Sequence, residues 1–137
     1  MRRIELLSNI SSLYEYKTMS DLEGNEFVLL RSCAEESIDF PIADKTAFEA
    51  VENHVHVIDK IKSSEISELV NASQIIGQSI LRNLGFHFPE KSFFVFISMT
   101  PGDSLIIRFH QKWHSETPYY DPQTFTNTKD IVLMFES

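Results

Sequence analysis

Cysteine and glycine are both scarce in this chain of 137 residues. The single cysteine, Cys33, excludes an internal disulfide and a zinc site built from several cysteines. Because Glu35 and Glu36 follow it closely, and acidic neighbours disfavour the reactive thiolate, we expect Cys33 to be buried and unreactive. The four glycines stand singly, which argues against a glycine-rich phosphate-binding loop.

Basic side chains are also few. The chain has 12 lysines and arginines against 20 aspartates and glutamates, which gives a formal net charge of −8. This balance argues against direct binding of nucleic acid, because phosphates require a basic face. The acidity is concentrated in residues 25–53, where two basic side chains stand against seven acidic ones, a net charge of −5. Such a segment is suited to a basic partner, or it is simply a solvated face.

Long apolar runs are missing as well. None is long enough to cross a bilayer. Because Glu5 and Ser8 interrupt the first apolar residues, we do not expect a signal peptide. The hydrophobic fraction of 42% and the charged fraction of 23% are ordinary for a globular protein. We therefore expect one domain, residues 1–137, in the cytoplasm and without membrane contact.

The hydrophobic pattern predicts both helices and strands. The clearest helix is 64–84, whose apolar residues recur in steps of three and four, with Ser64 as its N-cap and Gly85 at its C-terminal cap. Further helices are expected at 5–17 and directly after Asp44, the latter burying Ala47, Phe48 and Val51. Alternating or continuous apolar runs predict strands at 26–32, 54–59, 92–98, 104–111 and 130–136.

This order of elements predicts an α+β fold. Thr100-Pro101-Gly102-Asp103 is a turn signal between two strongly apolar strands, so we expect an antiparallel hairpin there. We predict a mostly antiparallel sheet with the 64–84 helix packed on it and a C-terminal β-hairpin.

Histidines suggest one kind of chemistry. His54 and His56 share a face of their strand because alternate residues do, and His110 or His114 could join them around a metal with Asp59, Glu116 or Asp121. This reading gives a small metal-dependent or hydrolytic enzyme using His54, His56 and His110. Nucleophile and zinc-peptidase motifs are missing. We therefore favour a protein without catalytic residues, metal or cofactor, in which His54 or His56 forms structural hydrogen bonds with Arg108 and His110.

Recognition is the other kind of chemistry. Aromatic side chains dominate binding hot spots, and carboxylates beside them attract a basic partner. One group of candidate contacts lies in the loop after residue 111: Trp113, Glu116, Tyr119, Tyr120 and Asp121. A second group lies in the acidic segment: Glu35, Glu36, Asp39 and Asp44. The simpler alternative for the aromatic residues is that they anchor the loop to the sheet.

Three stretches carry a resemblance to a known family: NHVHVID (53–59), FPEKSFFVFIS (88–98) and RFHQKW…E…PYYD (108–121). With the helix between the first two, they resemble the small immunity proteins of contact-dependent growth inhibition systems. Those belong to the wider set of bacterial polymorphic-toxin immunity proteins. The similarity spans residues 50–125.

The resemblance implies a cytoplasmic immunity protein that binds and neutralises one cognate toxin domain, delivered by a neighbouring cell. Such toxins are often nucleases with basic clefts, so an acidic inhibitor fits them. The family reading implies a protein partner and no enzyme activity. An adaptor subunit of another complex would share these features of composition and charge.

Overall fold

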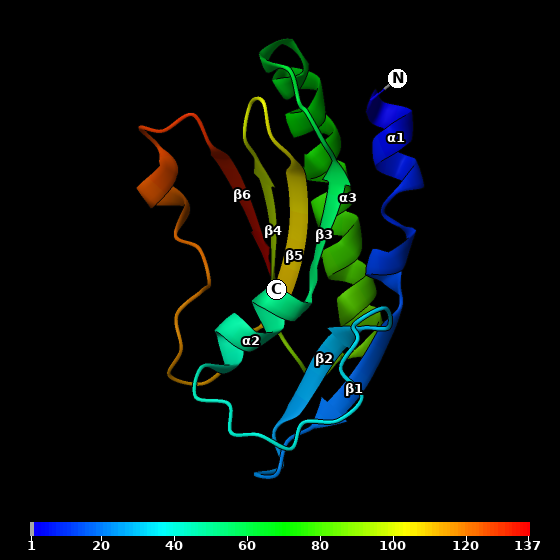
Figure 1. Ribbon diagram of the computed structural model, residues 1–137, viewed down its shortest axis with the longest axis vertical. Coiled ribbons are helices and arrows are strands. Elements are labelled where there is room, and N and C mark those ends of the chain that lie inside the picture. Colours follow the sequence, from blue (N-terminus) through cyan, green and yellow to red (C-terminus); the bar gives the residue numbers. More distant parts are fainter. Residues whose placement is uncertain (1) are drawn as a thin grey trace.

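The computed structural model describes residues 2–137, with side chains from Ile4 onward, and it has an α+β fold (Figure 1). Its α-helices are α1 (Arg2–Ser8), α2 (Lys45–Glu52) and α3 (Ile66–His87). Its 3₁₀ helices are η1 (Ser11–Tyr14), η2 (Ser63–Glu65) and η3 (Pro122–Phe125). Its strands are β1 (Tyr16–Ser20), β2 (Glu26–Leu30), β3 (His54–Ile58), β4 (Phe93–Met99), β5 (Leu105–Gln111) and β6 (Ile131–Glu136). The predicted α+β class is therefore confirmed.

All strand pairs are antiparallel, and they form two sheets. The larger sheet has the order β3-β5-β4-β6, and the smaller one pairs β1 with β2. A tight turn joins β4 to β5, and Gly102 has a φ of 84° there, a conformation that side chains disfavour. β6 returns to pair with β4, so β4 lies between two strands and is buried on both faces, as its apolar sequence predicted.

The long helix α3 packs against one face of the larger sheet, and α1 lies beside it (Figure 1). Leu69, Ile76, Ile80 and Leu84 form its buried stripe, as predicted. A Cβ atom at Gly77 would overlap the ring of Phe135, so β6 approaches the helix where no side chain intervenes.

The predicted long helix is present as α3, but both of its predicted cap residues were wrong. Ser64 lies inside η2, and α3 begins at Ile66. Gly85 does not end the helix, which continues to His87, where the Phe88 amide donates to the Leu84 carbonyl. Glycine was expected to end the helix because it adopts left-handed conformations easily. Here the aromatic contacts of His87 and Phe88 with Tyr16 accompany one more helical turn.

Two other sequence predictions also failed in part. The helix expected over 5–17 is divided, because α1 ends at Ser8 and Tyr16 starts a strand that pairs with β2. The helix after Asp44 is present, and the Asp44 side chain accepts from the Ala47 amide as an N-cap. Its buried face was misjudged: Thr46, Glu49 and Ala50 are buried, whereas Val51 is 48% exposed.

The second face of the larger sheet is covered differently. Phe94 and Phe96 of β4 lie beside Arg108 and His110 of β5, and all four side chains are buried. The long connection between β5 and β6, residues 112–130, covers them with aromatic rings, and α2 lies next to it (Figure 1). In the described residues, no helix is long and apolar enough to span a membrane.

Candidate functional site

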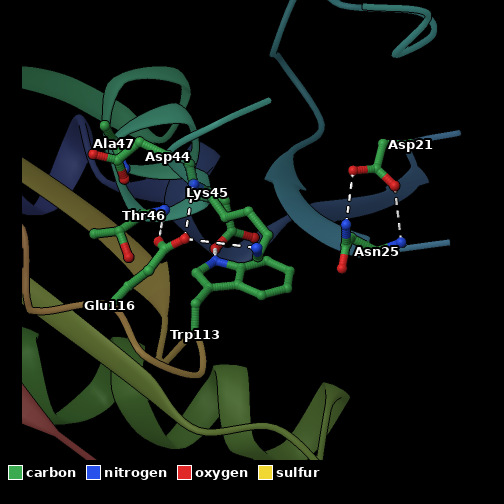
Figure 2. Close-up of polar contacts among 9 residues, drawn as sticks. Asp21, Asn25, Asp44, Lys45, Thr46, Ala47, Trp113 and Glu116 are labelled. Atoms are coloured by element: carbon green, nitrogen blue, oxygen red, sulfur yellow. Dashed lines mark hydrogen bonds and ion pairs between the residues drawn. The ribbon is translucent and has the colours of Figure 1, made fainter. Parts of the chain in front are cut away.

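Two acidic side chains from distant parts of the chain meet at the first turn of α2. The Glu116 carboxylate accepts from the Thr46 amide at 2.7 Å and from the Lys45 amide at 3.3 Å. Asp44 accepts from the Ala47 amide at 2.9 Å. The amides in the first turn of a helix have no hydrogen-bond acceptor within the helix. Here the carboxylates of Asp44 and Glu116 are the acceptors for these amides. Figure 2 shows both groups at the helix start.

This arrangement fixes the loop after β5 to α2. Glu116 and Thr46 are 70 positions apart in sequence, yet they are joined by a short hydrogen bond. The Lys45 ammonium group lies 3.6 Å from the Glu116 carboxylate and adds an ion pair. Desolvation alone would raise the pKa of Glu116, but the hydrogen bonds from Thr46 and Lys45 outweigh it and lower that pKa. Glu116 is therefore ionised at neutral pH.

A pocket of about 540 Å³ lies beside this junction. Its lining comes from both segments: Ala43, Asp44, Thr46 and Ala47 on one side, and Ser115, Glu116, Thr117, Pro118 and Tyr119 on the other. A second hollow of about 400 Å³ lies across the loop, lined in part by Tyr120, Asp121 and Met134. The exposed Asp44 and the part-exposed Glu116 give the first pocket an acidic lining suited to a cationic group.

Beneath this surface lies a buried carboxylate that sequence reasoning missed. Glu49 is fully buried and accepts four hydrogen bonds, all between 2.7 and 2.8 Å. The donors are the Val28 amide, the Gln111 amide, the Gln111 side chain and the Trp113 indole. Burial raises the pKa of Glu49 to about 7, although these donors oppose the rise.

The same face of α2 attaches the small sheet. Asn53, one turn after Glu49, accepts from the Leu30 amide and donates to the Val28 carbonyl, both at 2.8 Å. The Gln111 side chain donates to the Glu26 carbonyl at 3.0 Å. Together with Glu49, these side chains satisfy the edge of β2 that faces away from β1, where an unpaired strand would otherwise leave buried backbone groups without partners. The spacing of four between Glu49 and Asn53 was the only sequence signal for this role.

Trp113 was predicted to contact a partner, and the structure shows it anchoring the loop. Its indole nitrogen donates to Glu49, and its ring lies 5.1 Å from that of Phe27. The Lys45 ammonium group lies 5.7 Å from the indole ring, within cation–π range. Trp113 belongs to a small second core together with Phe27, Leu29, Ile38 and others. Trp113 is part-buried, and its contacts hold the loop in place beneath the surface.

Tyr119 and Tyr120 lie over Arg108. The guanidinium group is 5.1 Å and 5.4 Å from the two ring centroids. Arg108 also donates to the carbonyl of Ala50, near the end of α2, where a positive charge is favourable. Both rings are part-exposed, and each lines one of the two hollows. The tyrosines therefore anchor the loop with one side and present the other side to the surface.

His110 has both ring nitrogens engaged. Nε2 accepts from the Tyr119 amide at 3.1 Å, and Nδ1 lies 2.7 Å from the Gln111 carbonyl, to which it donates. The two contacts together require the neutral Nδ1–H tautomer. Burial lowers the pKa of His110, which agrees with a neutral ring. These bonds go to backbone groups, whereas the expected partners were His54 or His56. A side chain held in this way is poorly placed to take up a proton or a metal ion.

His54 and His56 lie on β3, the outer strand of the larger sheet. His54 and His56 are exposed, with ring centroids 5.4 Å apart, and Nδ1 of His54 donates to the Val51 carbonyl. His54 pairs with Arg108 across the strands, while His110 pairs with Phe94 on the far side of β5. Among the described residues, no group of three or more metal-binding side chains is assembled.

The remaining predicted contact residues are distributed along the surface. Glu36 and Asp39 are exposed, and Glu35 is part-buried, with its carbonyl accepting from the Lys17 ammonium group at 2.7 Å. Asp121 is exposed and caps η3 through the Gln123 amide.

Cys33 is part-buried, where full burial was expected. Its thiol donates to Glu52, and burial raises its pKa, as an unreactive thiol requires.

Comparison with protein-family profiles places the chain in a family. The profile of the Uncharacterized protein PM0498 family matches residues 6–137. The chain belongs to this family. No curated protein and no solved structure matches it. The matched range contains both segments that meet at α2, so the acidic surface lies inside the region that defines family membership.

Proposed function

We propose that this protein is an immunity protein: it binds a toxin domain with a basic surface, a nuclease being the favoured class, and neutralises it in the cytoplasm. One observation carries the proposal. Glu116 and Asp44 both cap the start of α2. The acidic segment that ends at Asp44 and the aromatic loop after β5 therefore form a single surface, with a pocket between them. Resemblance to contact-dependent growth inhibition immunity proteins supports the same function.

Charge supports a basic partner. The chain carries a net charge of −8. Exposed Asp44 lines the pocket, and exposed Asp121 lines the hollow on the other side of the loop. A charged surface of this kind raises the association rate with an oppositely charged protein, and the effect weakens as salt screens it. A nuclease has to be basic where it holds phosphates, so its substrate cleft is the natural target for such an inhibitor.

The residues divide into two roles in this proposal. Glu116 and Trp113 hold the loop in place from within, through α2 and Glu49. The exposed acid Asp44 and the outer face of Tyr119 meet the partner across the pocket. Catalysis is not part of the proposal: the protein acts by occupying the toxin.

Co-expression tests the proposal directly. The chain is expressed with the toxin domain encoded by the reading frame directly upstream of its gene. We expect growth to be rescued and the two proteins to co-purify as a complex. If cells die equally with and without the chain, and no complex forms between the purified proteins, the proposed function is wrong.

The charge argument has its own test. Asp44→Asn removes a negative charge but keeps a residue that caps a helix about as well as aspartate. We expect association with the toxin domain to slow severalfold at low salt and the difference to shrink at high salt. The control is Asp103→Asn, which removes an exposed charge from the β4–β5 turn, at the other end of the molecule (Figure 1). Equal rates for both variants would contradict the assignment of this surface.

A further inference from the structure

Two large apolar side chains are exposed side by side at the end of the small sheet. Leu22, in the turn between β1 and β2, is 81% exposed, and Phe40, in the loop before α2, is 40% exposed. Both line one small hollow of about 120 Å³, together with Asp21, Glu23, Pro41 and Ile42. This hollow is far below the roughly 300–1,000 Å³ of small-molecule sites, so its size suits a single side chain.

The turn that carries Leu22 is held in one shape. The Asp21 carboxylate accepts from the Glu23 amide, the Asn25 amide and the Asn25 side chain at 2.9–3.0 Å. Two of these contacts are drawn in Figure 2. Gly24 has a φ of 85° and completes the turn. The turn therefore needs Asp21, Gly24 and Asn25, but no hydrogen bond or packing contact within it calls for leucine. Because the backbone of the turn is already held, placing Leu22 against a partner orders only its side chain.

Phe40 is anchored at one edge only. Its ring lies 6.1 Å from that of Phe48, which in turn lies 5.2 Å from buried Phe27. Ile42 packs against the same small core. The inner side of this segment is thus fixed, while the outer side of the Phe40 ring faces solvent next to Leu22.

Acidic groups surround this apolar pair. Asp21 and Glu23 lie in the lining of the hollow, and exposed Asp39 precedes Phe40 in the chain. Hydrogen bonding from the Asn25 side chain, opposed by desolvation, lowers the pKa of Asp21 and keeps it ionised. An apolar centre with a charged rim is the ordinary anatomy of a protein–protein interface. The charged side chains that line the hollow, Asp21 and Glu23, are both acidic, which favours a basic partner. Lys45 lies near Asp21 but forms its ion pair with Glu116.

Adjacent stretches of the chain line the hollow and the pocket at α2. Phe40, Pro41 and Ile42 line the hollow, and the next residues in the chain, Ala43 and Asp44, line the pocket. In Figure 1 the β1–β2 turn and this loop lie together at the lower end of the molecule. A partner seated at α2 would therefore also cover Leu22 and Phe40.

We infer that the Leu22–Phe40 hollow anchors the toxin domain by accepting one apolar side chain that is flanked by lysine or arginine. The inference rests on the proposed function, since it takes the partner to be a basic toxin domain. The apolar contact supplies most of the affinity, as buried central contacts do in other interfaces. The acidic rim pairs with the flanking cations and mainly sets the association rate.

Leu22→Ser is the decisive variant, because an 81% exposed side chain contributes little to folding. The 137-residue chain and the upstream toxin domain are mixed as purified proteins, and the dissociation constant is measured by calorimetry. We expect the dissociation constant to rise about tenfold or more, chiefly through faster dissociation. Phe40→Ser should act in the same direction, provided that its thermal midpoint stays within a few degrees of the parent's.

Ile75→Ser is the matched control. Ile75 is 72% exposed on α3, away from the acidic surface, so its loss removes a similar apolar area. We expect its dissociation constant to equal that of the parent.

The outcomes separate the inference from the proposed function. No complex with the parent chain overturns both. A parent complex that Leu22→Ser leaves as tight as before overturns the inference alone. A parent chain that forms a dimer, which Leu22→Ser abolishes, assigns the hollow to a second copy and also overturns the inference.

Discussion

Replacing the buried Glu49 with glutamine tests the junction under the candidate surface. Each Glu49 oxygen accepts two hydrogen bonds: Oε1 from the Gln111 amide and the Trp113 indole, and Oε2 from the Val28 amide and the Gln111 side chain. A glutamine amide has only one acceptor oxygen, so two buried donors would face its NH₂ group. Each buried donor without a partner costs about 1–3 kcal/mol.

At pH 4 the parent carboxyl is protonated: its carbonyl oxygen keeps two donors and its hydroxyl oxygen can accept from a third, whereas the glutamine NH₂ group accepts from none. The variant therefore leaves about one more buried donor without a partner, and the expected loss in free energy of unfolding at pH 4 is about 1–3 kcal/mol. A loss of this size is measurable against a total stability of roughly 7–20 kcal/mol for a chain of this length. Urea denaturation followed by the fluorescence of Trp113, the single tryptophan, measures the difference.

The pH dependence of this difference gives a sharper test. Burial raises the pKa of Glu49 from 4.5 to about 7 in the folded protein. Between those values the folded state holds a proton that the unfolded state has released, so the contribution of Glu49 to stability is complete below pH 4.5. It falls as the pH rises to about 7, by roughly 3 kcal/mol. Since glutamine does not titrate, the free energy of unfolding of the parent should fall by that amount relative to that of the variant from pH 4 to pH 8.

Two results would refute this reasoning. A parent that gains stability relative to the variant as the pH rises would mean that the four donors outweigh desolvation and hold the pKa of Glu49 below its usual value. A difference that is the same at both pH values would mean that its pKa is the same in the folded and unfolded states. Glu52→Gln, on the same helix but only part-buried, is the control and should lower the free energy of unfolding at pH 4 much less than Glu49→Gln does.

The remaining predictions concern α3 and the loop after β5. Gly77→Ala should lower the free energy of unfolding by about 1–3 kcal/mol, because the new methyl group overlaps Phe135. Gly85→Ala has open space in the same helix and should raise it by up to about 1 kcal/mol; urea denaturation of both variants checks the pair, and equal effects would contradict it. Glu116→Ala should cost about 1 kcal/mol through the lost cap and should speed proteolysis within residues 112–130; an unchanged cleavage rate would show that Glu116 does not hold the loop.

Elements built from local patterns could be predicted from the sequence. The stripe of α3 and the hairpin of β4 and β5 follow from periodicity and from one turn, all within short distances along the chain. The predicted helix over 5–17 failed because Tyr16 pairs with Leu30 and packs on Phe109. Contacts with residues so distant in sequence cannot be read from the local hydrophobic pattern.

The candidate site shows the same limit. Asp44 was predicted correctly as a cap, because its partner is three positions away. The role of Glu116 could not be predicted, since its partners are 70 and 71 positions away. Glu49 was passed over because a charged residue in a helix is normally placed on the solvent side. Its burial is explained only by donors from β2, β5 and the following loop.

The candidate surface crosses the junction between the two sheets. Leu22 and Phe40 project from the small-sheet side, whereas Glu116 and Tyr119 come from the loop after β5 of the larger sheet. Glu49 and Asn53 hold the two sides together through β2. A partner that contacts both sides binds only when this junction is closed, so its affinity falls by the fraction of molecules in which the junction is open. Weaker binding by Glu49→Gln would thus reflect a larger fraction of molecules with an open junction. Weaker binding by Leu22→Ser at unchanged stability would reflect the loss of a direct contact with the partner.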